Sequence, residues 1–213
     1  MNRRYTPQTH VGNSQQRTPE WFKEREGKLT GSAFGQAASL GPGSRQQLWR
    51  RMMGMETFEG NEATEWGTTN EPVAIDRYEQ ETGSKVDLVG FVVHPSMAWL
   101  GCSPDFLVGA DGMGEVKCPF SQQVYEAIPP YYMAQVQGAL EVTSREWCDF
   151  VCWTPTVTRI TRVARSPEYW DWLHLKLADF WTWVVARVEP PRAKREQPPP
   201  TDHLILSDRL IEF

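Results

Sequence analysis

The sequence predicts an α/β fold in which a mixed central β-sheet carries helices on both faces, and three observations lead to this prediction. Apolar runs typical of strands occupy residues 86–94, 98–108, 113–118, 146–153 and 158–164. These runs are largely continuous rather than alternating, as in a sheet that is covered on both faces. Segments with helical spacing precede, interrupt and follow the runs, so helices are available for both faces.

Length and composition indicate one domain with a sizeable core. The chain has 213 residues, of which 40% are hydrophobic. No apolar run approaches the roughly 20 residues that span a bilayer, and residues 1–10 lack a signal-peptide core. We therefore expect a cytoplasmic protein with no membrane partner. The four cysteines lack the paired spacing of zinc or iron–sulfur sites, and we expect reduced, mostly buried thiols.

Charge is distributed unevenly along a chain whose net charge is −5. Residues 1–51 contain nine Lys or Arg against three Asp or Glu, whereas residues 52–90 contain two against nine. The overall acidity argues against a protein that coats nucleic acid. The basic first segment suits a partner that is held at one place.

The first helix is expected to start at Thr18-Pro19, a hydroxyl cap followed by a proline at the first helical position, and to stop near Gly27. A second start at residues 30–32 leads into residues 33–38, and residues 44–53 also have helical spacing. Because helix N-termini favour anions, Ser32 and Arg25 are candidates for a phosphate site. The alternative is that Ser32 is a plain cap and Arg25 a surface cation, which spacing alone favours.

The next helix is expected to open at residues 66–72 and to run to Gly83. Glu71, Ala74, Ile75 and Tyr78 follow at i, i+3, i+4 and i+7, so Glu71 shares the stripe that faces the core. A glutamate in a first turn often only complements the helix dipole. Its alignment with the buried stripe makes Glu71 a candidate for a metal site.

A hairpin around Asp111-Gly112 carries charge toward the interior. Glu115 and Lys117 are two residues apart on one strand and must share a face, and Asp105 lies roughly opposite them on the other arm. Such a set is usually a solvated surface or an ion pair. Here the charges belong to apolar strands, and buried charge is tolerated chiefly when it is paired or coordinates an ion. The hairpin is therefore a candidate divalent-metal site.

Two helices are expected after this hairpin, at residues 121–128 and 130–141. In the second, Gln135 points where apolar side chains point, so its buried amide needs a partner such as a substrate phosphate, whereas Gln137 is turned away. A long aromatic helix is expected at residues 169–188. Residues 1–189 would then form the domain, and residues 190–213 a Pro-rich linker with an apolar tail that docks on the same domain or on a neighbouring subunit.

The hairpin and its surroundings resemble a known family. Asp105 followed by Glu115-Val116-Lys117 is similar to the PD-(D/E)xK nuclease signature. The longer stretches at residues 102–105, 115–120 and 132–137 resemble the phage lambda exonuclease and YqaJ-type viral recombinase family. The resemblance extends from about Trp21 to Trp153 and implies a restriction-endonuclease-like core.

The resemblance also implies an activity: a Mg²⁺-dependent exonuclease that degrades the 5′-ended strand of linear double-stranded DNA and leaves a 3′ overhang. Two Mg²⁺ ions per site are expected, with Mn²⁺ as a substitute. The implied partners are duplex DNA ends and a single-strand annealing protein of the same recombination system. The family further implies a homotrimer, encoded by a phage or prophage and acting in the cytoplasm of a bacterial host.

The resemblance assigns site residues by role. The implied catalytic residues are Asp105, Glu115 and Lys117, and the implied metal ligands are Asp105, Glu115, the Val116 carbonyl and Glu71. The implied 5′-phosphate ligands are Arg25, Ser32 and Gln135, and the possible secondary positions are Gln137 and Gln123. One departure is visible, since Gln122-Gln123 stand where the family places an arginine. Two alternatives remain: an endonuclease or structure-specific nuclease on the same core, and a catalytically silent DNA-end-binding module.

Overall fold

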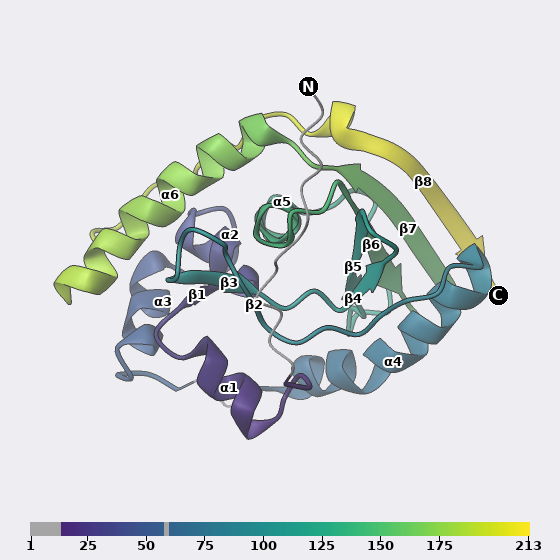
Figure 1. Cartoon of the computed structure of the whole chain (residues 1–213), viewed down its shortest axis with the longest axis horizontal. Helices are drawn as coiled ribbons and strands as arrows, with labels where there is room; N and C mark the ends of the chain where they lie inside the picture. Colours follow the sequence, from purple (N-terminus) through teal and green to yellow (C-terminus); the bar gives the residue numbers. More distant parts are fainter. Residues whose placement is uncertain (1–13, 58–59) are drawn as a thin grey trace.

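The computed structural model describes residues 14–57 and 60–213. The elements, in chain order, are α1 (Pro19–Arg25), β1 (Leu29–Thr30), η1 (Gly31–Ala33), α2 (Phe34–Ala37), α3 (Arg45–Met52), α4 (Glu62–Thr82), β2 (Val92–Val93), β3 (Leu100–Cys102), β4 (Phe106–Val108), β5 (Gly112–Lys117), α5 (Pro130–Thr143), β6 (Trp147–Trp153), β7 (Val157–Ala164), α6 (Pro167–Ala186), η2 (Asp202–Leu204) and β8 (Ile205–Glu212) (Figure 1). Within the described ranges, no helix combines the length and apolarity that a membrane span requires.

The main sheet has five strands in the order β4-β5-β6-β7-β8 (Figure 1). Strands β5 and β6 pair in parallel, with α5 as the crossover between them, whereas the other neighbours pair antiparallel. A smaller sheet has the order β1-β3-β2. The predicted α/β fold with a mixed sheet is therefore confirmed.

The two faces of the main sheet belong to two hydrophobic cores. On one face, Val116 and Ile160 pack with Ala74 and Tyr78 of α4. On the other face, Met113, Phe150 and Val163 pack with α5, and α6 lies beyond α5 (Figure 1). Successive side chains of β5 alternate between these cores, which sends Glu115 and Lys117 to the α5 side.

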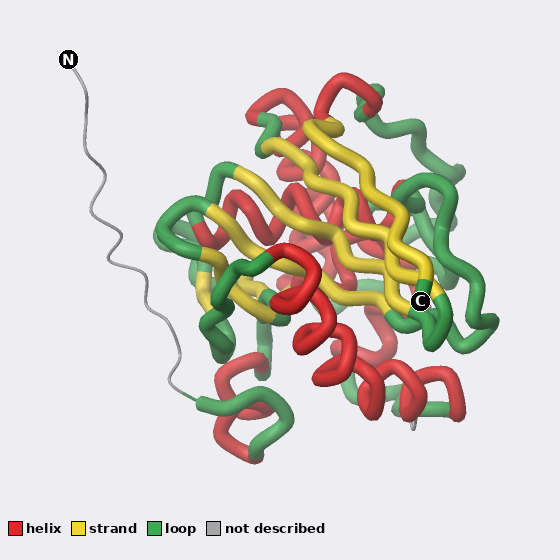
Figure 2. The backbone as a smooth tube through the Cα atoms, turned by 90° about the vertical axis from the view of Figure 1, so that its right-hand side faces the viewer, coloured by secondary structure: helices red, strands yellow, loops and turns green. Residues whose placement is uncertain are grey.

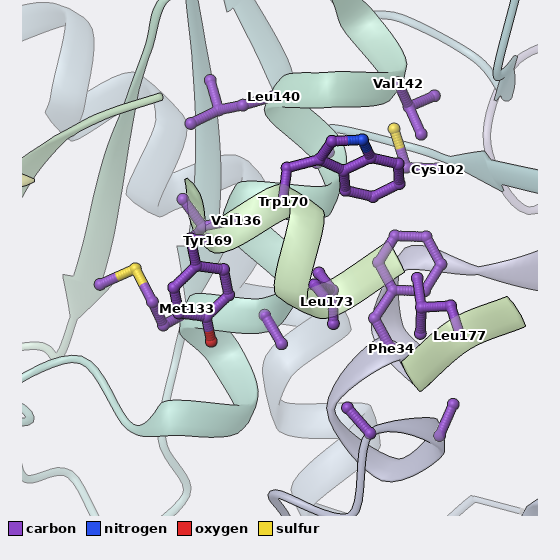
Figure 3. Packing of buried hydrophobic residues seen from close by; sticks show 14 of the residues in the cluster. Phe34, Cys102, Met133, Val136, Leu140, Val142, Tyr169, Trp170, Leu173 and Leu177 are labelled. Carbon is purple, nitrogen blue, oxygen red and sulfur yellow. The ribbon is translucent and has the colours of Figure 1, made fainter. Parts of the chain in front are cut away.

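Helix α5 is buried because it lies between the sheet, α6 and the short helix α2. Met133 and Val136 of α5 pack close to Tyr169 and Leu173 of α6 (Figure 3). A Cβ atom at Gly138 would lie 2.4 Å from the Phe34 ring, so only glycine allows α2 to approach this closely.

A polar network ties α4 to the sheet. Asp149 on β6 is 1% exposed and accepts hydrogen bonds from Arg162 Nε and Nη2, both at 2.8 Å. The hydroxyl of Tyr78 donates to Asp149 Oδ2 at 2.7 Å. The buried carboxylate is thereby fully paired, and the helix that carries Glu71 is anchored two turns from that residue.

Two expected strands are shorter than predicted. The run 86–94 forms only β2 and an isolated bridge between Asp87 and Leu107. The run 98–108 is divided into β3 and β4 by residues 103–105, because Pro104 has no N–H for a strand ladder. Because Asp105 lies in this break, its side chain is not bound to the alternating directions of strand side chains.

Two helix predictions were wrong. Residues 121–128 form an irregular loop, with Gln122 at φ 54° and the carbonyls of Tyr125 and Glu126 held by Arg159 Nη1 at 2.8 Å. Helix α4 begins at Glu62, capped by Asn61, rather than near Glu71. Pro72 thus lies inside the helix, and Glu71 stands mid-helix.

The C-terminal segment packs on its own domain. Residues 190–201 have no regular structure, and β8 then pairs antiparallel with β7, with a register shift near Val163. In Figure 2 the strands lie side by side and the C-terminus sits at the end of the outermost strand.

Candidate active site

Asp105 directly precedes β4, beside the part of β5 that pairs with β6 but no longer with β4. Its backbone N–H donates to the Gly114 carbonyl at 3.1 Å, and its Oδ2 accepts from the Val116 N–H at 2.6 Å. The Asp105 carboxylate therefore takes the place of a neighbouring strand along β5. This hydrogen bond holds the Asp105 carboxylate on the arm opposite Glu115 and Lys117, as the sequence predicted.

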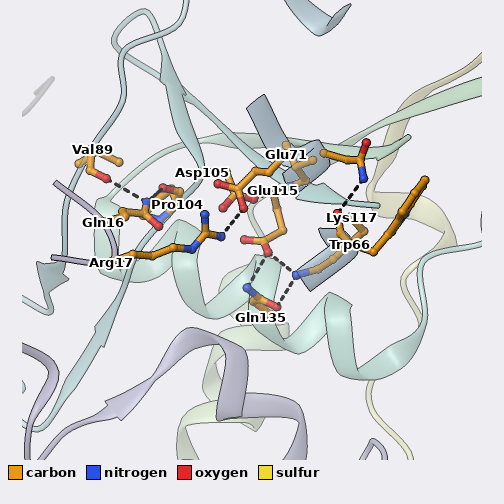
Figure 4. Close-up of polar contacts among 12 residues, drawn as sticks. Gln16, Arg17, Trp66, Glu71, Val89, Pro104, Asp105, Glu115, Lys117 and Gln135 are labelled. Atoms are coloured by element: carbon orange, nitrogen blue, oxygen red, sulfur yellow. Dashed lines mark hydrogen bonds and ion pairs between the residues drawn. The ribbon is translucent and has the colours of Figure 1, made fainter. Parts of the chain in front are cut away.

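Glu115 and Lys117 share one face of β5, as expected from the strand period. Lys117 Nζ lies 2.6 Å from Glu115 Oε1 and 4.6 Å from the centre of the Tyr132 ring. Gln135 of α5 donates from Nε2 to Glu115 Oε1 at 2.6 Å and accepts from Lys117 at 3.3 Å (Figure 4). The buried amide thus finds its partners in Glu115 and Lys117.

Glu71 approaches the hairpin from α4, which packs on the face of the main sheet opposite to α5. Its Oε2 accepts from Arg17 Nη2 at 2.7 Å, and its side chain is 22% exposed (Figure 4). Ala74, Ile75 and Tyr78 are buried below it, so the predicted helical stripe is confirmed.

The three carboxylates influence one another electrostatically. Burial raises the pKa of Asp105, and the nearby charges of Glu115 and Glu71 raise it further. Burial also raises the pKa of Glu115, although Lys117 opposes this effect. Burial by itself lowers the pKa of Lys117, but Glu115 and Asp105 together outweigh it, so the pKa lies above its ordinary value. A cation bound among the carboxylates would relieve their repulsion.

The donor set suits a hard divalent cation, since Asp105, Glu115 and Glu71 offer oxygen ligands. In the part of the chain that the structure describes, no group of three or more His, Cys, Asp or Glu side chains is arranged to hold a metal ion as it stands. Each carboxylate is instead held by a partner within the chain: Val116 N–H, Lys117 with Gln135, or Arg17. Metal binding would therefore exchange these partners.

A cavity of ≈ 480 Å³ opens beside the hairpin and is lined by Arg25 and Ser32 as well as by Asp105, Glu115 and Lys117. Arg25 stacks 4.0 Å from the centre of the Trp21 ring, and its Nη1 reaches the Ser103 hydroxyl at 3.5 Å. Trp21 Nε1 donates to the same hydroxyl at 3.0 Å. Among the described residues, Arg25 has no carboxylate partner, which leaves its charge available to an anion.

Other residues differ in their relation to this cavity. Gln137 lies in the core, where its amide bonds the Ala164 carbonyl and the Ser166 N–H, so its position does not support the secondary role expected for it. Gln123 is exposed on the loop after β5 and does not line the cavity. Ser103 and Arg17 were not predicted. Ser103 could have been suspected from its place directly before Pro104-Asp105, whereas no sequence signal marked Arg17.

Known proteins share this architecture. The YqaJ-like viral recombinase domain family matches residues 20–146. An alkaline exonuclease from Laribacter hongkongensis, LHK-Exo, is 34% identical, with a TM-score of 0.70 over 81% of this chain and 95% of that chain. LHK-Exo in complex with dAMP gives 33% identity and a TM-score of 0.71 at the same coverage. A phage-related exonuclease from Haemophilus somnus, 14% identical, shares the fold at a TM-score of 0.57 over 75% of this chain and 96% of that chain. No curated protein matches the sequence.

Proposed function

The chain belongs to the YqaJ-like viral recombinase domain family, whose nuclease fold it shares with alkaline exonucleases, and from this premise we propose a specific reaction. The protein is a Mg²⁺-dependent 5′→3′ exonuclease that degrades the 5′-ended strand of linear duplex DNA. The product is a duplex with a 3′ single-stranded overhang.

One observation carries the proposal: a single cavity joins a carboxylate-rich hairpin to a partly buried arginine that has no carboxylate partner within residues 14–57 and 60–213. Asp105, Glu115 and Lys117 line one part of the cavity, and Arg25 and Ser32 line another. A nuclease that starts from a phosphorylated end needs both parts within reach of one nucleotide. The neighbour LHK-Exo was crystallised with dAMP, a nucleotide that carries one phosphate group.

The roles of the residues follow from their chemistry. Asp105, Glu115, Glu71 and the Val116 carbonyl would hold two Mg²⁺ ions, and Mn²⁺ would substitute for them. Bound Mg²⁺ supplies Lewis-acid stabilisation of phosphate charge and a lowered pKa for water. Lys117, held by Glu115, orients the attacking water and adds positive charge beside the scissile phosphate.

The terminal 5′-phosphate is assigned to Arg25, Ser32 and Gln135, with the Ser103 hydroxyl added from its contact with Arg25. Gln135 is placed between the two parts of the site because it bonds Glu115 and Lys117 and also lines the cavity. Gln135 would thus couple the position of the phosphate to the position of the catalytic pair.

The test is digestion of linear duplexes that carry a label at one known end, with and without Mg²⁺. We expect loss of the 5′-ended strand only, faster from 5′-phosphate than from 5′-hydroxyl ends, and no product with Asp105→Ala. Equal rates on both kinds of end would refute the phosphate pocket. Cutting of covalently closed circles would instead indicate an endonuclease, and binding without cleavage a silent end-binding module.

The biological setting is also proposed. We infer a homotrimer that hands its 3′ overhangs to a single-strand annealing protein, in the cytoplasm of a bacterial host of the phage or prophage that encodes it. Residues 1–189 hold the proposed nuclease site, and residues 190–213, which add the edge strand β8 to the main sheet, would meet a neighbouring subunit. Native mass measurement tests the trimer, since a strictly monomeric species contradicts it.

A further inference from the structure

The Arg17 side chain occupies a position that the proposed reaction leaves unexplained. Its guanidinium bonds the Glu71 carboxylate at 2.7 Å, and the side chain as a whole is 45% exposed. Glu71 is one of the proposed metal ligands. An arginine on a metal ligand competes with the metal for the same carboxylate, so its presence calls for a separate role.

The backbone around Arg17 holds it firmly in this place. The preceding Gln16 donates to the carbonyls of Val89 and Pro104 at 3.0 and 2.8 Å (Figure 4). The following Thr18 caps α1 by accepting from the Trp21 N–H. Arg17 itself has φ 69°, a left-handed conformation that favours glycine. Such backbone strain is found most often at functional sites, so the left-handed conformation of Arg17 motivates a functional hypothesis for its side chain.

Arg17 also lines two cavities. One is the cavity of ≈ 480 Å³ beside the hairpin, and the other is a second cavity of ≈ 550 Å³. Both cavities are lined by Arg17, Glu71 and Asp105. A strand that contacts Asp105 in either cavity therefore also comes close to Arg17.

The charges near the hairpin are unequal when no metal is bound. The negative charges come from three carboxylates, Asp105, Glu115 and Glu71. The positive charges come from two side chains, Lys117 and Arg17. A divalent ion that binds Glu71 would provide the same compensation and displace the guanidinium. Once displaced, Arg17 keeps its half-exposed place beside both cavities, where phosphate is the anion that nucleic acid offers.

We propose that Arg17 is an exchangeable counter-cation: it neutralises Glu71 in the metal-free enzyme and passes to a phosphate of the DNA strand when metal binds. The role rests on the proposed metal-dependent nuclease and adds a substrate-positioning residue to it. Arg17 therefore opposes metal binding and favours DNA binding, two effects of opposite sign that a purely structural residue would not combine.

The experiment is calorimetric titration of the full, metal-free chain with Ca²⁺, followed by binding of a 5′-phosphorylated duplex in Ca²⁺. Arg17→Ala is compared with wild type and with Arg77→Ala, which breaks a 2.7 Å ion pair to Glu81 on the same helix away from the site. Arg17→Gly serves as a second variant, because glycine suits the left-handed backbone and removes the same charge.

Both Arg17 variants are expected to bind Ca²⁺ about two- to fivefold more tightly, the range of a half-exposed ion pair, and to bind the duplex more weakly by a similar factor. Arg77→Ala should match wild type in both measurements. Unchanged or weaker Ca²⁺ binding, or unchanged duplex binding, in the Arg17 variants overturns the proposal while the metal centre stands. A wild type that binds no Ca²⁺ overturns the metal centre and the role of Arg17 together.

Discussion

Replacing Lys117 with methionine separates the contribution of the lysine charge to stability from the contribution of its packing. Methionine keeps the length and much of the volume of the side chain and removes its charge. The Glu115 side chain is 4% exposed and its Oε1 lies 2.6 Å from Nζ, so Lys117→Met leaves a buried carboxylate without its cation. Gln135 still donates to the same oxygen at 2.6 Å.

The expected loss of stability follows from these contacts. Removing one partner of a buried ion pair costs about 3–5 kcal/mol, and the remaining Gln135 hydrogen bond places the effect near the lower limit, at about 3 kcal/mol. For a chain of this size that corresponds to a melting temperature lower by about 6–12 °C. The double variant Lys117→Met/Glu115→Gln should recover most of this loss, because the lone charge is gone.

The stability that Lys117→Met loses should also depend on pH. Burial raises the pKa of Glu115, so the folded state binds a proton more readily than the unfolded chain, whose carboxyl titrates near 4.5. The unfolding free energy of Lys117→Met should therefore fall as the pH rises from 4.5 through the folded-state pKa, and the deficit should shrink in acid.

Urea unfolding in EDTA of the wild type, both single variants and the double variant gives the coupling energy of the pair. A coupling energy below about 0.5 kcal/mol, within the additivity of independent sites, would refute the reasoning. A deficit of Lys117→Met that does not change with pH would refute it too.

Three further predictions address the scaffold and the ligands. Gly138→Ala places a methyl group 2.4 Å from the Phe34 ring and should lower the unfolding free energy by about 1–3 kcal/mol, measured by urea unfolding. Tyr78→Phe leaves the buried Asp149 one donor short and should cost about 1–3 kcal/mol in the same measurement, whereas unchanged stability would mean that the network does not anchor α4. Because burial raises the pKa of Asp105, Ca²⁺ binding measured by calorimetry should weaken with falling pH while exposed carboxylates are still ionised, and a flat profile would contradict this.

The chemistry of the hairpin was predictable from the sequence because it depends on local geometry. The two-residue period of a strand places Glu115 and Lys117 on one face. The hairpin sets Asp105 opposite them, although its loop is residues 109–111 and not the expected Asp111-Gly112 pair. The core-facing stripe of α4 was predictable for the same reason. Gln135 was correctly placed in the interior, although its partners Glu115 and Lys117 could not be read from helical spacing.

What the sequence did not predict depends on long-range contacts. The loop at residues 121–128 is held by Arg159 from a strand more than thirty residues away, which overrides its local spacing. The start of α4 was missed because its first turns, from Glu62 onward, lie outside the apolar stripe from which the helix was predicted. Arg17 had no periodic pattern, and only the approach of α4 to residues 16–18 gives it a partner.

The contact between Trp21 and Ser103 has a consequence for how the protein folds during synthesis. The two residues are 82 positions apart, whereas the segment from Asp105 to Trp153 that forms β4, β5, α5 and β6 is contiguous. At a synthesis rate of about 5–20 residues per second, Trp21 and Arg25 would wait about 4–16 s for the hydroxyl that joins them. Ser103 is synthesised before the segment from Asp105 to Trp153, so the contact that joins Trp21 and Arg25 to Ser103 can form before β5, α5 and β6 have been made.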